Sequence, residues 1–124
     1  MLQVLGIAAG GALGSLMRFW TSRAVYGIAG REFPYGTLTV NVLGSLVMGV
    51  LYVLLLDRVT ESVEWRGFLL VGFLGAFTTF STFSIETFNL LEDGEIIKAL
   101  VNVLLSVVLC LGATWLGIVF GRQL

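Results

Sequence analysis

The chain has 124 residues, of which 57% are hydrophobic and only 12% are charged, and its formal net charge is −1. An ordinary soluble domain carries about 25% charged residues, so this composition, with a mean hydropathy of +0.99, excludes that class. The near-neutral charge also argues against a nucleic-acid partner, which would need a basic surface.

Four long stretches of the sequence carry no charged side chain. They are Met1 to Met17, Tyr35 to Leu56, Gly67 to Ile85 and Ala99 to Gly121. Each is near or above the roughly 17–25 residues that a membrane-spanning helix needs. Nothing basic precedes Arg18, so the first stretch lacks the charged start of a cleaved signal peptide. We therefore predict an all-α integral membrane protein with one domain over residues 1–124 and transmembrane helices at about 2–25, 36–56, 66–91 and 96–121.

The first predicted helix has small residues at every fourth position, namely Gly6, Gly10 and Gly14. Small residues at this spacing let a neighbouring backbone approach closely, so they predict a packing face. Arg18 is the first charged residue and lies toward the far end of this helix. It fits two roles equally well: a side chain that snorkels to the interface, or an anion-attracting group at the vestibule of a pore.

The second predicted helix has a polar face formed by Thr37, Asn41 and Ser45, which recur every four residues. Asn41 lies well inside the span, where exposure of its amide to lipid would be expensive. We therefore expect this amide to face protein or water. An interhelical hydrogen bond and a place beside a polar path are both consistent with its position.

The third predicted helix contains a segment, Val71 to Ser84, with five hydroxyl side chains, two glycines and four phenylalanines. Glycine weakens a helix, and Ser and Thr hydroxyls compete with its backbone hydrogen bonds. Irregular backbone at membrane depth is tolerated only inside protein or beside a water-filled cavity. We therefore predict a third helix that is broken mid-span and lines a polar path. Phe77, Phe80 and Phe83 recur every third residue and would share one side of a tightened turn.

Polar residues near the end of the third predicted helix and along the fourth are also candidates. Glu86 is expected to form a structural ion pair with a basic residue such as Arg18. The fourth helix has a narrow polar stripe of Asn102, Ser106, Cys110 and Thr114 at four-residue spacing. A stripe over several turns favours a polar track, although a single Ser or Thr in a span is usually packed or bonded to its own backbone. The one cysteine cannot form an internal disulfide and is expected to be a small apolar filler.

The basic residues give no firm orientation in the membrane. Arg58, Arg66 and Arg122 lie on one predicted side, and Arg31 and Lys98 lie on the other, with Arg18 and Arg23 near it. Orientation normally follows an excess of Lys and Arg in the cytoplasmic loops, and here neither side has a clear excess. One interpretation is that copies insert both ways and form an antiparallel dimer, equivalent to the inverted repeats of transporters.

Three segments of the sequence carry a resemblance to a known family. They are Gly10-Gly11-Ala12-Leu13-Gly14-Ser15-Leu16-Met17-Arg18, Pro34-Tyr35-Gly36-Thr37-Leu38-Thr39-Val40-Asn41 and Gly75-Ala76-Phe77-Thr78-Thr79-Phe80-Ser81-Thr82-Phe83-Ser84. In order, spacing and chain length they resemble the Fluc (CrcB) family of small bacterial fluoride channels. The resemblance covers essentially the whole chain, and the Thr-Thr-Phe-Ser-Thr-Phe run is quite specific to that family.

The resemblance implies a dual-topology homodimer in the bacterial inner membrane, with two parallel pathways that export fluoride passively. It implies that Phe80 and Phe83 form an aromatic pore lining and that Asn41 contacts the ion. It also implies a structural Na⁺ ion at the dimer centre, held by main-chain carbonyls of Gly75 and Thr78. The family often has glycine where this chain has Ala76, and this difference changes none of the ion-contacting roles that the resemblance implies.

The chemistry of such a pathway can be considered from the residues themselves. Fluoride is small and strongly hydrated, so a pore must replace its water with hydrogen-bond donors. Candidate donors are the Asn41 amide and the hydroxyls of Ser81, Thr82 and Ser106, with Thr114 of the polar stripe as a further pathway residue. Aromatic rings have positive edges, so Phe80 and Phe83 presented edge-on would attract an anion without a fixed charge that binds it too tightly to leave.

Two other functions remain open at this point. A proton-coupled exporter of cationic drugs, similar to other small four-helix dual-topology proteins, needs a membrane-embedded carboxylate, and Glu86 lies near a helix end. A non-transporting membrane scaffold would use the glycine faces to bind another protein and would carry no ion flux. An enzyme is not expected, because no nucleophile–base pair or metal cluster lies within reach.

Overall fold

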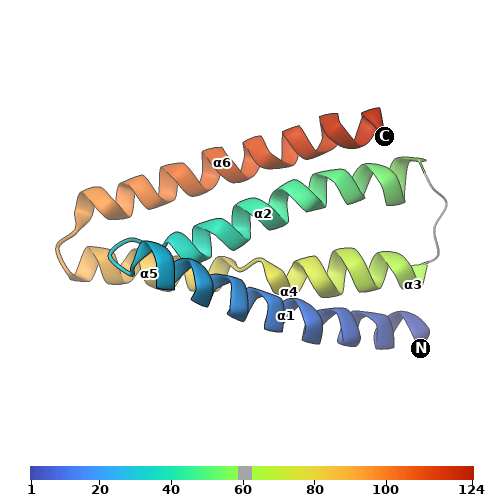
Figure 1. Cartoon of the computed structure of the whole chain (residues 1–124), viewed down its shortest axis with the longest axis horizontal. Coiled ribbons are helices and arrows are strands. Elements are labelled where there is room, and N and C mark those ends of the chain that lie inside the picture. Colours follow the sequence, from blue (N-terminus) through green and yellow to red (C-terminus); the bar gives the residue numbers. More distant parts are fainter. Residues whose placement is uncertain (59–62) are drawn as a thin grey trace.

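The computed structural model describes the backbone of residues 1–58 and 63–124, and the side chains of residues 1–55 and 63–124. Every regular element in this described part is helical. The elements are α1 Leu2–Ala29, α2 Tyr35–Tyr52, the π-helix η1 Val53–Arg58, α3 Val63–Arg66, the π-helix η2 Gly67–Leu74, α4 Gly75–Phe77, α5 Phe80–Glu92 and α6 Ile96–Gln123. They form an elongated bundle with both chain termini at the same end (Figure 1).

Four helical stretches of the described residues are long and apolar enough to cross a membrane. They are Leu2–Ala29, Tyr35–Leu55, Val63–Glu92 and Ile96–Gln123. The all-helical class and the presence of four helices long and apolar enough to span a membrane are thereby confirmed. The first helix continues past position 25 to Ala29, and the last continues past 121 to Gln123. The side chains of Leu56 and Arg58, which enter the predictions above, lie outside the described side chains.

Glycines fix how the first span packs against the third. The first span, α1, makes its main contacts with η2, and α2 makes its main contacts with α6, as the paired ribbons in Figure 1 indicate. Gly10 and Gly14 are buried, and a Cβ atom added to either would overlap a backbone carbonyl oxygen, that of Phe68 or Phe73 respectively. Close backbone approach at small residues is a usual way for helices to associate in lipid. The predicted packing face on the first helix is confirmed.

The third span leaves regular helix between α4 and α5. Thr78 has backbone angles φ −90° and ψ 159°, and Thr79 has φ −153° and ψ 124°, so both are extended. The Leu74 carbonyl accepts from both the backbone N–H and the hydroxyl of Thr78, at 3.1 and 2.9 Å. Thr79 then begins α5 as its N-cap, because its hydroxyl oxygen accepts from the Thr82 backbone N–H at 3.3 Å. A side-chain oxygen at this position satisfies one of the free donors at a helix start.

The extended pair also separates the phenylalanines of this segment. Phe77 ends α4 and is buried, with its ring stacked on Phe73 at 6.0 Å between centroids. Phe80 and Phe83 lie in α5 and form a tilted pair at 5.3 Å. The expectation that Phe77 joins Phe80 and Phe83 on one side of a tightened turn is therefore wrong. Two extended residues, rather than a tight helical turn, lie between the two pairs.

Candidate functional site

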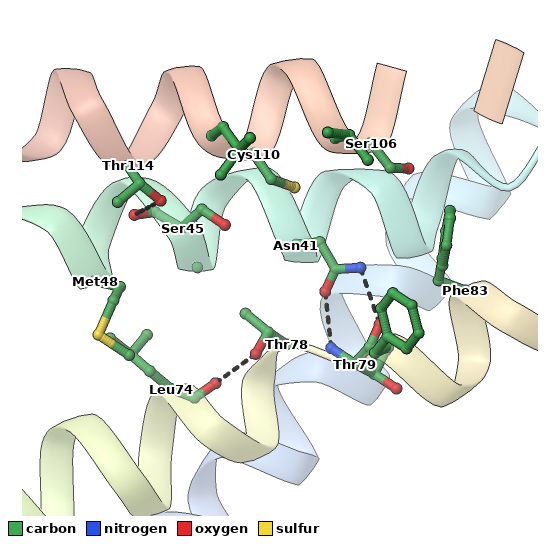
Figure 2. Close-up of a pocket in the computed structure, with 14 residues that line it drawn as sticks. Asn41, Ser45, Met48, Leu74, Thr78, Thr79, Phe83, Ser106, Cys110 and Thr114 are labelled. Carbon is green, nitrogen blue, oxygen red and sulfur yellow. Dashed lines mark hydrogen bonds between the residues drawn. The ribbon is translucent and has the colours of Figure 1, made fainter. Parts of the chain in front are cut away.

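A cavity of about 410 Å³ lies between α2, the Thr78–Thr79 interruption, α5 and α6. Side chains on α6 and α2 face those of the third span across it (Figure 2). Its lining residues are Asn41, Gly44, Ser45, Met48, Leu74, Thr78, Thr79, Phe80, Phe83, Ser106, Val107, Cys110, Leu111 and Thr114. None of these described lining residues carries a charged side chain, and we name this space the neutral cavity.

Asn41 is bonded to the backbone of the interruption. Its Nδ2 donates to the Thr79 carbonyl at 2.9 Å, and its Oδ1 accepts from the Thr79 N–H at 2.7 Å, as the two dashed lines in Figure 2 mark. The side-chain amide thus pairs with both backbone polar groups of Thr79, including an N–H that the extended conformation removes from the helical hydrogen-bond pattern. An amide nitrogen carries two hydrogens, so one of them remains for a partner in the neutral cavity.

The two phenylalanines of α5 border the neutral cavity to different extents. Phe83 is partly buried, whereas Phe80 is 77% exposed in the single chain. Their rings are tilted by 44° to each other. Both therefore lie at the cavity, and Phe80 presents most of its surface outside this one chain.

The polar stripe of α6 divides into two groups. Ser106, Cys110 and Thr114 line the neutral cavity, and the Thr114 hydroxyl donates to the Ser45 carbonyl at 3.3 Å. Asn102 does not line it. This residue is only 1% exposed, and its Nδ2 donates to the Thr87 hydroxyl of α5 at 2.8 Å.

A second cavity of about 330 Å³ lies toward the end of the bundle where α1 and α5 meet α2. Its lining residues are Arg18, Phe19, Ser22, Arg23, Tyr26, Arg31, Thr37, Thr79, Thr82 and Glu86. We name it the charged vestibule. Thr79 lines both the vestibule and the neutral cavity, so both spaces border the interruption.

The expected ion pair between Arg18 and Glu86 is not formed among the described side chains. Arg18 Nε donates to the Ala76 carbonyl in the last turn of α4 at 2.9 Å. Glu86 instead accepts hydrogen bonds from the hydroxyls of Tyr26, at 2.9 Å, and Thr37. The physical reason is that nearby neutral donors satisfy the carboxylate, while the guanidinium satisfies a helix-end carbonyl that has no partner within the helix.

A model of one protein family, described as "CrcB-like protein, Camphor Resistance (CrcB)", matches residues 5–118. The chain belongs to the CrcB family. Similar proteins named "Fluoride-specific ion channel FluC" occur in Methylococcus capsulatus, Coxiella burnetii and Geobacter metallireducens. Their identities to this chain are 56% over 123 residues, 50% over 124 and 54% over 124.

The alignments with these relatives cover 99%, 99% and 100% of this CrcB chain. They cover 54% of the Methylococcus protein and 100% of each of the other two. The chain therefore spans about half the length of one relative and the whole length of the others. With its four spans, this CrcB chain is a multi-pass membrane protein.

The other residues of this CrcB chain that were predicted to line the ion pathway or to hold Na⁺ lie in several places. Thr82 lines the charged vestibule. Ser81 is exposed and lines neither cavity, with its hydroxyl 3.4 Å from that of Thr79. Gly75 is also exposed, at the start of α4, and Thr78 lines the neutral cavity.

Three residues that organise this site in the CrcB chain were missed from the sequence. The side chains of Tyr26 and Thr87 bond to Glu86 and Asn102, and the backbone of Thr79 bonds to the Asn41 side chain. For Thr79 a signal was present, since Thr is one of the residues preferred as the N-cap of a helix. Tyr26 and Thr87 make contacts across helices that no spacing within one helix specifies.

The main-chain carbonyls assigned to Na⁺ by the resemblance can be tested against this geometry. The residues four positions after Gly75 and Thr78 are Thr79 and Thr82, and their N–H groups donate to the Asn41 and Thr79 side chains instead. The two carbonyl oxygens thus lose their usual helical donors. Oxygen ligands suit a hard cation, and the negative end of the helix dipole favours positive charge. The donor set fits Na⁺.

Proposed function

We propose that this chain is a fluoride-selective channel through which fluoride leaves the cell passively across the bacterial inner membrane. The observation that carries the proposal is the neutral cavity, whose polar groups are amide and hydroxyl groups beside two aromatic rings. Relatives of 50–56% identity are named as fluoride-specific ion channels, which agrees with that chemistry and with the expectation that the chain is not an enzyme.

The two cavities suggest a path for the anion. Arg18, Arg23 and Arg31 line the vestibule, and positive charge at an entrance raises the local anion concentration. Thr79 is common to both spaces. We therefore infer that fluoride passes from the charged vestibule to the neutral cavity at this residue.

Inside the neutral cavity, uncharged donors replace the water of the ion. The second Nδ2 hydrogen of Asn41 is the donor left free in the α2 wall. In the α6 wall the hydroxyls of Ser106 and Thr114 donate to Asn102 and to the Ser45 carbonyl, and we infer that they turn to the ion when it enters. Thr82 offers its hydroxyl from the vestibule, and Ser81 next to it is exposed and stays a proposed pathway residue. The positive edges of Phe80 and Phe83 add attraction. Because none of these groups carries a full charge, binding stays weak enough for release.

We further propose that two copies associate in opposite orientations and form two pathways. Phe80 lines the neutral cavity yet is 77% exposed, so this wall is open in one chain and a second copy can close it. The exposed start of α4 at Gly75 supports a contact in the same region. Carbonyls of Gly75 and Thr78 from both copies would hold a structural Na⁺ there, which supplies positive charge that offsets the cost of an anion in low dielectric.

The exporter alternative finds less support. Within the described spans the carboxylate nearest to the cavities is Glu86, which lines the vestibule and accepts two hydrogen bonds. None of the described residues that line the neutral cavity is acidic. A carboxylate is the group that would have to bind both the proton and a cationic substrate.

An efflux assay on purified protein tests the proposed function. Liposomes with and without the protein are loaded with both potassium fluoride and potassium chloride, and each anion is followed by its own electrode after dilution with valinomycin. We expect protein-dependent release of fluoride that is much faster than that of chloride. Equal rates for both anions, or no protein-dependent release, would contradict the proposal.

A further inference from the structure

The second half of the third span is held in place by few contacts. None of the residues of α5 is buried in the single chain, although α5 carries Phe80 and Phe83. Two adjacent residues tie it to its neighbours. Glu86 accepts from Tyr26 of α1 and Thr37 of α2, and Thr87 accepts from Asn102 of α6.

The bond to Thr87 continues to the backbone of Phe83. The Thr87 hydroxyl donates to the Phe83 carbonyl one helical turn earlier, at 2.7 Å. Because a hydroxyl has a single hydrogen, Thr87 can only accept from Asn102, and the distance of 2.8 Å from Asn102 Nδ2 agrees with this. The polar chain therefore runs without a break from α6 to the main chain of a cavity-lining residue.

The other end of the same polar chain reaches a second cavity-lining residue. With its NH₂ group facing Thr87, Asn102 presents Oδ1 to Ser106, whose hydroxyl oxygen lies 3.4 Å away as the donor. Asn102 is thus buried and bonded on both sides of its amide. A buried amide whose partners are specified by hydrogen-bond direction fixes one arrangement of the groups around it.

We propose that Asn102 is a positioning residue of the ion pathway, which acts through Thr87 to fix the turn of α5 that carries Phe83. Asn102 does not line the neutral cavity and has no contact with the ion in this role. The expected effect of Asn102 on fluoride flux rests on the proposed function. The expected effect of Asn102 on the position of the Phe83 ring does not depend on conduction.

The first test is a double-mutant cycle on fluoride efflux from liposomes. Thr87→Val keeps the shape of the side chain and removes the hydroxyl, Asn102→Leu removes the amide, and Thr87→Ser restores the hydroxyl. Loss of one such hydrogen bond corresponds to a fall of about three- to tenfold in efflux. Each single variant should show this fall, the double variant should fall no further, and Thr87→Ser should conduct near the wild-type rate. Independent effects that multiply in the double variant would overturn the proposal.

Ser84→Ala is the matched control. Its hydroxyl also donates to the carbonyl four residues earlier, that of Phe80 at 2.9 Å, but it lies on the exposed side of α5 and has no described bond to α6. We expect its efflux to stay near the wild-type rate. An equal loss in Ser84→Ala and Thr87→Val would overturn the proposal, because any weakening of α5 would then suffice.

A spectroscopic test separates this proposal from the proposed function. Protein labelled with fluorophenylalanine gives a ¹⁹F resonance for Phe83, which is assigned by its absence in Phe83→Leu. Thr87→Val and Asn102→Leu should move or broaden this resonance, whereas Ser84→Ala should leave it unchanged. An unmoved Phe83 resonance in the first two variants would overturn the positioning role even if the wild type conducts fluoride. A shifted Phe83 resonance would support the positioning role even if the wild type does not conduct fluoride.

Discussion

Asn41 illustrates how one side chain can serve both the fold and the proposed pathway. Both ends of its amide bond the backbone of Thr79, whose N–H lies in the extended interruption and outside the helical hydrogen-bond pattern. Buried polar backbone groups without partners are costly. The amide removes that cost and still has one hydrogen free for the neutral cavity, so both roles considered for Asn41 from the sequence are compatible.

The pairing predicts a strong effect of Asn41→Asp. A carboxylate cannot donate to the Thr79 carbonyl, and its negative charge repels fluoride. We expect fluoride efflux to fall at least about tenfold, which corresponds to the loss of a hydrogen bond and the addition of like charge. Efflux from liposomes is the measurement, and an unimpaired Asn41→Asp channel would be incompatible with a pathway past this residue.

Asn89→Asp provides the same chemical change at a different place. Asn89 is exposed on α5 and lines neither the neutral cavity nor the charged vestibule. We expect this variant to conduct near the wild-type rate. An equal loss in both variants would assign the effect to net charge rather than to the position of Asn41.

Among the helical elements, α1 and η2 depend on glycine for their contact. A Cβ atom at Gly10 would overlap the Phe68 carbonyl oxygen, whereas a Cβ atom at the neighbouring Gly11 would lie 4.0 Å from the nearest atom, the Gly72 carbonyl oxygen. Two adjacent glycines therefore face different surroundings. Only the first is required by packing.

Gly10→Ala should lower the stability of the protein in detergent by about 1–3 kcal/mol, the usual cost of overpacking. Gly11→Ala should be neutral or slightly stabilising, since alanine favours helix over glycine. Thermal denaturation followed by size-exclusion chromatography gives the comparison. Equal melting temperatures for the two variants would show that α1 does not pack on η2 through Gly10.

Hydropathy was enough to find the four spans, because uncharged length is what a bilayer selects. The glycine spacing also predicted the packing face of α1 correctly. The π-helical geometry of η1 and η2 could not be predicted, since it depends on how a helix fits its neighbours. Within the candidate site, the sequence pointed to Asn41 and Phe83 but gave Glu86 the wrong partner, because partners across helices follow from packing rather than from spacing.

Both termini of the chain lie at one end of the elongated bundle (Figure 1). Its basic residues show no clear excess on either side, and the wall of the neutral cavity at Phe80 is open. Insertion in both orientations and closure of that wall by an opposed copy would explain both features.

This dual orientation predicts a mixed topology in cells. A protease site and tag added after Leu124 should be cleaved in roughly half of the copies in sealed inside-out membrane vesicles, because no charge bias selects one side. Immunoblotting before and after detergent lysis gives the fraction. Complete cleavage or complete protection in sealed vesicles would rule out the antiparallel dimer.

We propose that ring edges and neutral donors, rather than a fixed positive charge, carry fluoride through the neutral cavity. Fluoride efflux from liposomes that contain the Phe83→Ile variant tests this, and size-exclusion chromatography of the purified variant shows whether it assembles as the wild type does. We expect efflux to fall at least about tenfold in a variant with the elution volume of the wild type. Unchanged fluoride efflux from a correctly assembled Phe83→Ile protein would contradict it.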